Sequence, residues 1–133
     1  MMREILFRGQ RDDTKEWVYG AFVPDALEGS NDLVSWGFIR NYNRDTRKMQ
    51  MLEVDRETVG QFTGLTDKNK SKGFEGDIVT SGKSIGVIVF HDGRFIIDWI
   101  VNKDFWSDTI YVHLPVSKII GNRWDNPELL EDV

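Results

Sequence analysis

The sequence contains no cysteine and has two histidines, His91 and His113, among its 133 residues. Without cysteine there is no disulfide framework, no thiol nucleophile and no thiolate ligand for zinc or an iron–sulfur cluster. A two-histidine metal site would need both histidines, so we expect no metal and no cofactor. Long apolar runs are absent as well, because no stretch approaches the roughly 18 residues that span a bilayer. We therefore expect a soluble, cytoplasmic protein.

The composition is that of a folded globular protein rather than a disordered one. Hydrophobic residues make up 40% and charged residues 29% of the chain, close to the usual proportions. Seventeen basic residues stand against 22 acidic ones, which gives a net charge of −5. That sign disfavours nonspecific binding to nucleic acid, whose affinity comes from neutralising phosphates. The exception is a basic segment at residues 40–48.

Apolar residues alternate with polar ones along most of the chain, which is the period of a β-strand. In the first half, two strands around residues 5–7 and 17–23 predict an N-terminal hairpin. Residues 33–40 and 49–54 flank a polar stretch and predict a second hairpin with a basic tip. Asp55 is placed to cap one short turn that runs through Thr58.

The second half contains five short segments rich in β-branched and aromatic residues, at 77–80, 85–90, 94–101, 109–114 and 119–124. Five short strands with tight links favour an SH3-like barrel. We therefore expect a mainly β protein with an N-terminal β subdomain (1–75), a variant SH3-like barrel (76–133) and a short C-terminal helical turn at Pro127. The alternation predicts these core residues: Val87, Val89, Phe95, Ile97, Trp99, Ile110, Val112 and Leu114.

Several blocks of the sequence resemble the YopX family of phage and prophage proteins: residues 3–9 (REILFRG), 17–20 (WVYG), 53–69 (EVDRETVGQFTGLTDKN), 74–79 (FEGDIV), and 120–122 with 126–130. The resemblance implies a β-rich, phage-encoded protein with an N-terminal subdomain before an SH3-like barrel, acting in the bacterial cytoplasm. It implies no activity, since the family has no assigned function. The family usually has Asn-Gly where Asn69 and Lys70 stand here, and lysine tolerates a positive φ poorly.

One motif suggests catalysis, but its context argues against it. Residues 82–86 match the nucleophile-elbow pattern G-x-S-x-G, and Asp98 and His113 follow Ser84 in the order found in hydrolases. A nucleophile elbow needs a helix after the serine, whereas an apolar strand follows here. We therefore expect no catalytic residues and no enzyme activity, with an unrecognised hydrolase as the third-ranked alternative.

Two other features point to binding. Phe105 and Trp106 are adjacent, and neighbouring side chains on an extended backbone point to opposite sides, so one of them is left for a protein partner. The favoured function is therefore a non-catalytic protein-binding module that self-associates or binds a host or phage protein. The runner-up is nucleic-acid binding at the basic hairpin, where tyrosine would stack on a base, through Arg40, Tyr42, Arg44, Arg47 and Lys48.

Overall fold

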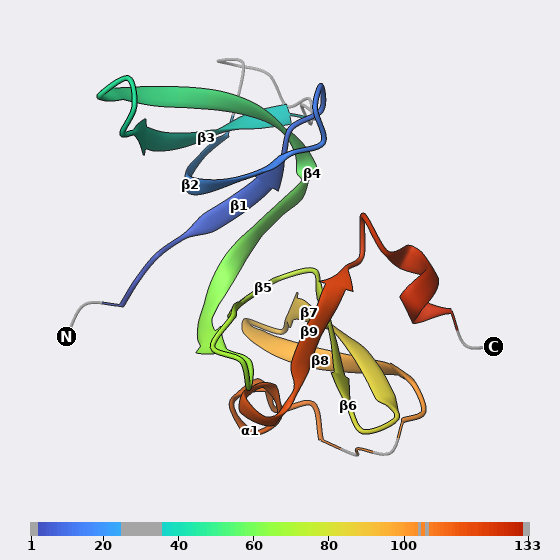
Figure 1. The fold of residues 1–133 in the computed structure, drawn as a ribbon. Coiled ribbons are helices and arrows are strands. Elements are labelled where there is room, and N and C mark those ends of the chain that lie inside the picture. Colours follow the sequence, from blue (N-terminus) through green and yellow to red (C-terminus); the bar gives the residue numbers. More distant parts are fainter. Residues whose placement is uncertain (1–2, 25–35, 104, 106, 132–133) are drawn as a thin grey trace. The chain divides into compact units, whose positions relative to one another are not determined.

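The protein is described by a computed structural model over residues 3–24, 36–103, 105 and 107–131 (Figure 1). The chain divides into two compact units, unit 1 (Met1–Gln61) and unit 2 (Phe62–Val133). Regular structure in the described residues is mostly antiparallel strand, which confirms the mainly β prediction. The predicted boundary between an N-terminal subdomain (1–75) and a second subdomain (76–133) stays a prediction. None of the helices in the described ranges is long and apolar enough to cross a membrane.

The strands of unit 1 pair in a closed circuit. Strand β1 (Phe7–Gln10) pairs with both β2 (Trp17–Pro24) and β4 (Lys48–Thr66), while β3 (Trp36–Asn43) pairs with β2 and β4. Both predicted hairpins are therefore confirmed. The second is longer than expected, because Asn41 and its neighbours continue β3 and leave a tip of four residues, 44–47.

The core of unit 1 lies on the inner face of this circuit. Val18, Ile39 and Val54 are buried there, and partly buried Phe7 and Phe22 pack against them. Each core residue has polar or exposed neighbours along its strand, as the alternating pattern requires. Because β4 pairs with a strand on each side along part of its length, these pairings stabilise it.

The turn predicted at residues 55–58 is instead a bulge within β4. Gln10 lies opposite Asp55 and Arg8 lies opposite Gly60, so β4 contains extra residues here. The predicted capping role of Asp55 does occur, since its Oδ1 accepts the backbone N–H of Glu57 at 3.0 Å. The Thr58 hydroxyl oxygen accepts the backbone N–H of Gln10 at 2.9 Å and so satisfies a donor that the bulge leaves unpaired.

Unit 2 contains a four-stranded antiparallel sheet in the order β8-β7-β6-β9. These strands are β6 (Asp77–Ser81), β7 (Ser84–His91), β8 (Arg94–Val101) and β9 (Lys118–Asn122). They confirm four of the five strands expected after residue 76. A short strand, β5 (Lys72–Phe74), pairs with the last residues of β4. The predicted C-terminal helical turn is also present, as the 3₁₀ turn η2 (Pro127–Leu130) with Asn126 at its N-cap.

The strand predicted at residues 109–114 is wrong. The segment forms the short helix α1 (Ile110–His113), which runs into the 3₁₀ turn η1 (Leu114–Val116). Ile110 and Leu114 are four residues apart and are both buried against the unit 2 core, as one helix face requires. Val112 was also predicted to be core, but it points away from that face and is 53% exposed. Tertiary packing here overrides the β propensity of the β-branched residues.

Candidate functional site

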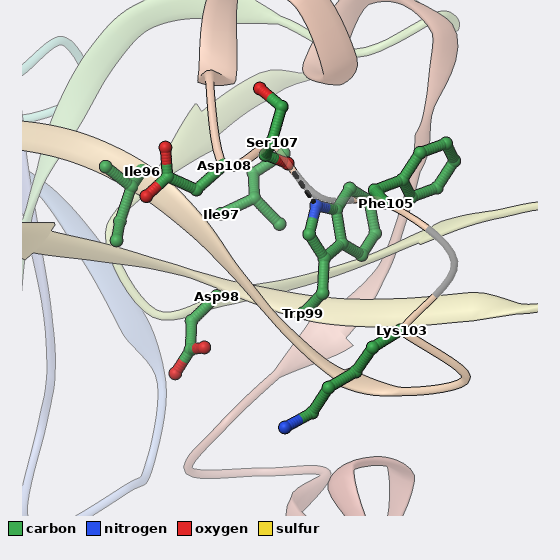
Figure 2. A pocket seen from close by; sticks show the side chains of 8 residues that line it. All are labelled: Ile96, Ile97, Asp98, Trp99, Lys103, Phe105, Ser107 and Asp108. Atoms are coloured by element: carbon green, nitrogen blue, oxygen red, sulfur yellow. Dashed lines mark hydrogen bonds between the residues drawn. The ribbon is translucent and has the colours of Figure 1, made fainter.

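Three rings gather at one corner of unit 2. Trp99 on β8 lies 4.8 Å from Phe105 and 5.6 Å from His113, measured between ring centroids. Phe105 and His113 are themselves 4.8 Å apart. The indole N–H of Trp99 donates a hydrogen bond to the Ser107 carbonyl at 3.1 Å, which ties the segment after β8 to the strand (Figure 2). The predicted core position of Trp99 is confirmed, since it is 6% exposed.

A pocket of about 240 Å³ opens beside these rings. Asp108, which lines the pocket, forms an ion pair with Arg94. The distance from Arg94 Nη1 to Asp108 Oδ1 is 3.2 Å. The lining is mixed, with four apolar or aromatic residues, three charged residues and one serine. Its lining is shown in Figure 2: Ile96, Ile97, Asp98, Trp99, Lys103, Phe105, Ser107 and Asp108.

The sequence predicted that one of two adjacent aromatic residues covers the core while the other is displayed. Phe105 is half-buried and packs against the core cluster of unit 2. Its position is that of a covering ring. Trp106 lies outside the described residues, so its role as an interface residue stays a prediction.

The three residues in hydrolase order have separate surroundings. Ser84 is fully buried, and its hydroxyl donates a short hydrogen bond to the Asn102 carbonyl. Asp98 is exposed on β8. His113 packs against the two rings described above, and its Nε2 is buried without a hydrogen-bond partner among the described residues. Because the Ser84 hydroxyl is enclosed and holds residue 102, a substrate does not reach it in this conformation.

The predicted basic residues lie together at the end of the β3–β4 hairpin, but they do not share one face. Arg40 and Tyr42 alternate on one side of β3, while Lys48 lies opposite Asn43 on the other side. Arg44 and Arg47 occupy the tip, and all five side chains are exposed. Sequence reasoning missed Met49 and Met51, which are 53% and 50% exposed beside Tyr42 and Arg40. The sequence carried no signal for their exposure, because alternation shows that a strand has two unlike faces but not which face meets water.

A buried carboxylate holds the turn between β4 and β5. Asp67 is 3% exposed. Its Oδ1 accepts hydrogen bonds from the backbone N–H groups of Asn69 at 2.8 Å and Ser71 at 2.9 Å. Its Oδ2 accepts a hydrogen bond from the backbone N–H of Ile119 at 3.0 Å. This support explains how Lys70 adopts a φ of +68°. Burial acts to raise the pKa of Asp67, but the three N–H groups outweigh it, and the pKa lies below its usual 3.8.

We expect Asp67→Asn to lower the free energy of unfolding at pH 7 by about 2 kcal/mol, because an amide nitrogen cannot accept the Ile119 N–H. A carboxyl whose folded pKa is lowered stabilises the fold above its unfolded pKa, and this stability is lost as the pH falls through the folded pKa. The difference between wild type and variant should therefore shrink below about pH 3.8. Urea denaturation midpoints across this range measure it, and a difference that stays constant with pH would contradict the assignment.

These observations define the class: a small, mainly antiparallel β protein built from two compact units. The sequence matches the YopX protein family over residues 6–131, and the chain belongs to that family. It is also similar to the crystal structure of protein EF1440 from Enterococcus faecalis, with a TM-score of 0.58 and 26% identity over 98% of this chain and 100% of that one. No curated protein matches the sequence.

Proposed function

We propose that the protein is a non-catalytic protein-binding module that self-associates in the cytoplasm of a phage-infected or lysogenic bacterium. One observation carries the proposal. Tyr42, Met49 and Met51 are each at least half exposed and neighbour one another on the β3–β4 hairpin. Soluble monomers rarely leave such side chains grouped in water, so a patch of this kind marks an interaction surface.

Unit 2 displays apolar side chains too. Tyr111 is 70% exposed and Val116 is 64% exposed on α1 and η1. We infer that unit 2 is a variant of the SH3-like barrel. Hydrogen bonds that join the turn after β4 to the start of β9 support this: Lys68 N–H to the Ser117 carbonyl at 2.9 Å, and Ile119 N–H to Asp67 at 3.0 Å. A small barrel of this kind displays its loops to partners while its core stays closed.

The loop that contains Phe105 and Trp106 provides a direct test. We expect the wild type to sediment as a homo-oligomer at tens of micromolar and Trp106→Ser to reduce its size, because serine removes most of the apolar area. Phe105→Ser should mainly lower the melting temperature, because Phe105 packs against Trp99 and His113. Sedimentation velocity and a melting curve on each variant separate the two effects. A monomeric wild type would refute self-association.

Nucleic-acid binding is the second candidate, and the exposed basic tip of the β3–β4 hairpin favours it. Its discriminating property is salt dependence, since phosphate contacts weaken steeply as salt rises. An affinity for DNA or RNA that is lost between low and moderate salt would place this candidate first. Hydrolase activity ranks third, and loss of an activity in Ser84→Ala with the fold retained would support it.

A further inference from the structure

The β3–β4 hairpin extends beyond its neighbouring strand. Backbone pairing between β2 and β3 reaches Ala21 opposite Arg40, and among the described residues the strand partners of 41–43 are 48–50. The Asn41 side chain still donates a hydrogen bond to the Tyr19 carbonyl of β2 at 2.8 Å. We call residues 41–50 the arm. A two-stranded hairpin is marginally stable in water by itself, so the arm gains from a surface that packs against it.

The two faces of the arm differ. On one face the side chains satisfy each other, since Gln50 Nε2 donates to Asn41 Oδ1 at 2.8 Å and Asn43 Nδ2 donates to Gln50 Oε1 at 3.3 Å. The other face, which we call the outer face, places Tyr42 beside Met49, and Arg40 beside Met51. The ribbon is therefore amphipathic with its apolar side open to solvent, the reverse of what an isolated hairpin favours.

Charge is ordered along the outer face. Arg47 lies in the tip, one residue before β4, with a φ of +57°. Within β4, Glu53 follows Met49 and Met51 on the same alternation. Residues 40–51 carry four basic residues and one acidic residue, a net charge of +3, whereas the rest of the chain carries −8. At the base, a cleft of about 330 Å³ is lined by Arg11, Asp12, Asp13 and Glu53. The outer face and its continuation along β4 thus have a basic end, an apolar middle and an acidic end.

From this order we infer that the outer face binds the outer face of a second copy of the chain, related by a two-fold axis between Met49 and Met51. This rests on the proposed self-association and names its surface. The axis runs across the strands and reverses their direction, so Met49 of one copy meets Met51 of the other. Glu53 lies three residues, roughly 10 Å, from Gln50 along β4. The axis therefore brings Glu53 toward the tip of the second copy, where the exposed side chain of Arg47 stands next to the start of β4.

The same axis brings Arg40 of one copy over Tyr42 of the other, since these two are level with Met51 and Met49. A guanidinium over a tyrosine ring is a favourable cation–π pair. The surface is thus complementary to itself in apolar, charged and cation–π contacts at once. An isologous interface of this kind closes as a dimer. An acidic partner protein would satisfy the tip alone and leave Glu53 facing like charge.

A charge exchange tests the pairing. Arg47→Glu and Glu53→Arg each place like charges together across the interface, so each single variant should weaken association at least about tenfold. The double variant exchanges the two ends and should recover association to within about threefold of wild type. Both side chains are exposed, and equal melting temperatures would show that the fold is kept. Single variants that associate like wild type, or a double variant weaker than either single, would overturn the assignment.

Because the chain contains no cysteine, thiol cross-linking at an introduced cysteine gives a second test with no reaction at other thiols of the protein. Met49→Cys and Met51→Cys proteins are mixed with a bis-maleimide that spans roughly the 10 Å between packed sheets. We expect the mixture to cross-link faster than either variant alone, because position 49 meets position 51 across the axis. Cross-linking that is no faster in the mixture would contradict the two-fold arrangement.

The outcomes separate the inference from the proposed function. A wild type that is monomeric at every concentration refutes both, whereas an oligomer that is unaffected by the charge exchange refutes only the assigned surface. The same variants test the alternative occupant. Suppose that single-stranded DNA binds the wild type, and that the double variant regains neither DNA binding nor self-association relative to the single variants. The arm then binds nucleic acid, and the inference is overturned.

Discussion

Trp99→Ala is expected to lower the free energy of unfolding by about 3–5 kcal/mol, as is usual when a buried tryptophan is truncated. The ring is 6% exposed and packs within the cluster that contains Ile88, Ile97 and Leu114. The variant also loses the hydrogen bond to the Ser107 carbonyl. The loss of core packing and the loss of this hydrogen bond both destabilise unit 2, so the midpoint of urea denaturation should fall clearly.

Two control variants identify the cause. Tyr111→Ala removes an aromatic side chain that is 70% exposed on α1, and we expect a change within about 0.5 kcal/mol. Trp99→Phe retains an aromatic ring but removes the indole N–H and part of the ring volume, so it should cost less than Trp99→Ala, about 1–3 kcal/mol. Circular dichroism during urea denaturation measures all three variants. An unchanged midpoint for Trp99→Ala would mean that β8 has another register.

The strands of unit 2 were predictable because local pattern and tertiary environment agree there. Ile97 and Trp99 alternate with exposed Asp98, and both are buried as expected. The segment that follows shows the limit of the same reasoning. Ile110 and Leu114 lie on one face in a strand and also on one face in a helix, so their burial fits both. Only the residue midway between them distinguishes the two structures, and Val112 is exposed.

The candidate surfaces were harder to predict than the fold. The basic tip was visible in the sequence because charges cluster there, but alternation gave no reason to leave Met49 and Met51 exposed. Alternation reports that a strand has two unlike faces, not which of them meets water. That depends on how far the neighbouring strand extends, and pairing from β2 ends opposite Arg40.

A comparison of two glycines in unit 2 is expected to show the second large effect. Gly76 and Gly64 have similar positive φ angles, +94° and +88°. A Cβ on Gly76 would lie 2.2 Å from Cζ3 of Trp124, whereas a Cβ on Gly64 would meet no atom within 4 Å. The backbone at Gly76 is held on both sides, by its N–H to the Ile88 carbonyl at 2.7 Å and by its carbonyl to the Arg123 N–H at 2.9 Å. The indole ring therefore has to move.

We expect Gly64→Ala to cost about 1–2 kcal/mol, the usual penalty of a positive φ for alanine. Gly76→Ala should cost about 2–5 kcal/mol, because displacement of the ring adds to the same penalty. Urea denaturation of both variants gives the difference directly, since the backbone term is common to the two. A third variant, Gly76→Ala with Trp124→Ala, removes the obstacle and should cost less than the sum of the two single changes. Equal costs for Gly76→Ala and Gly64→Ala would instead mean that Trp124 moves aside freely and does not fix the entry to β6.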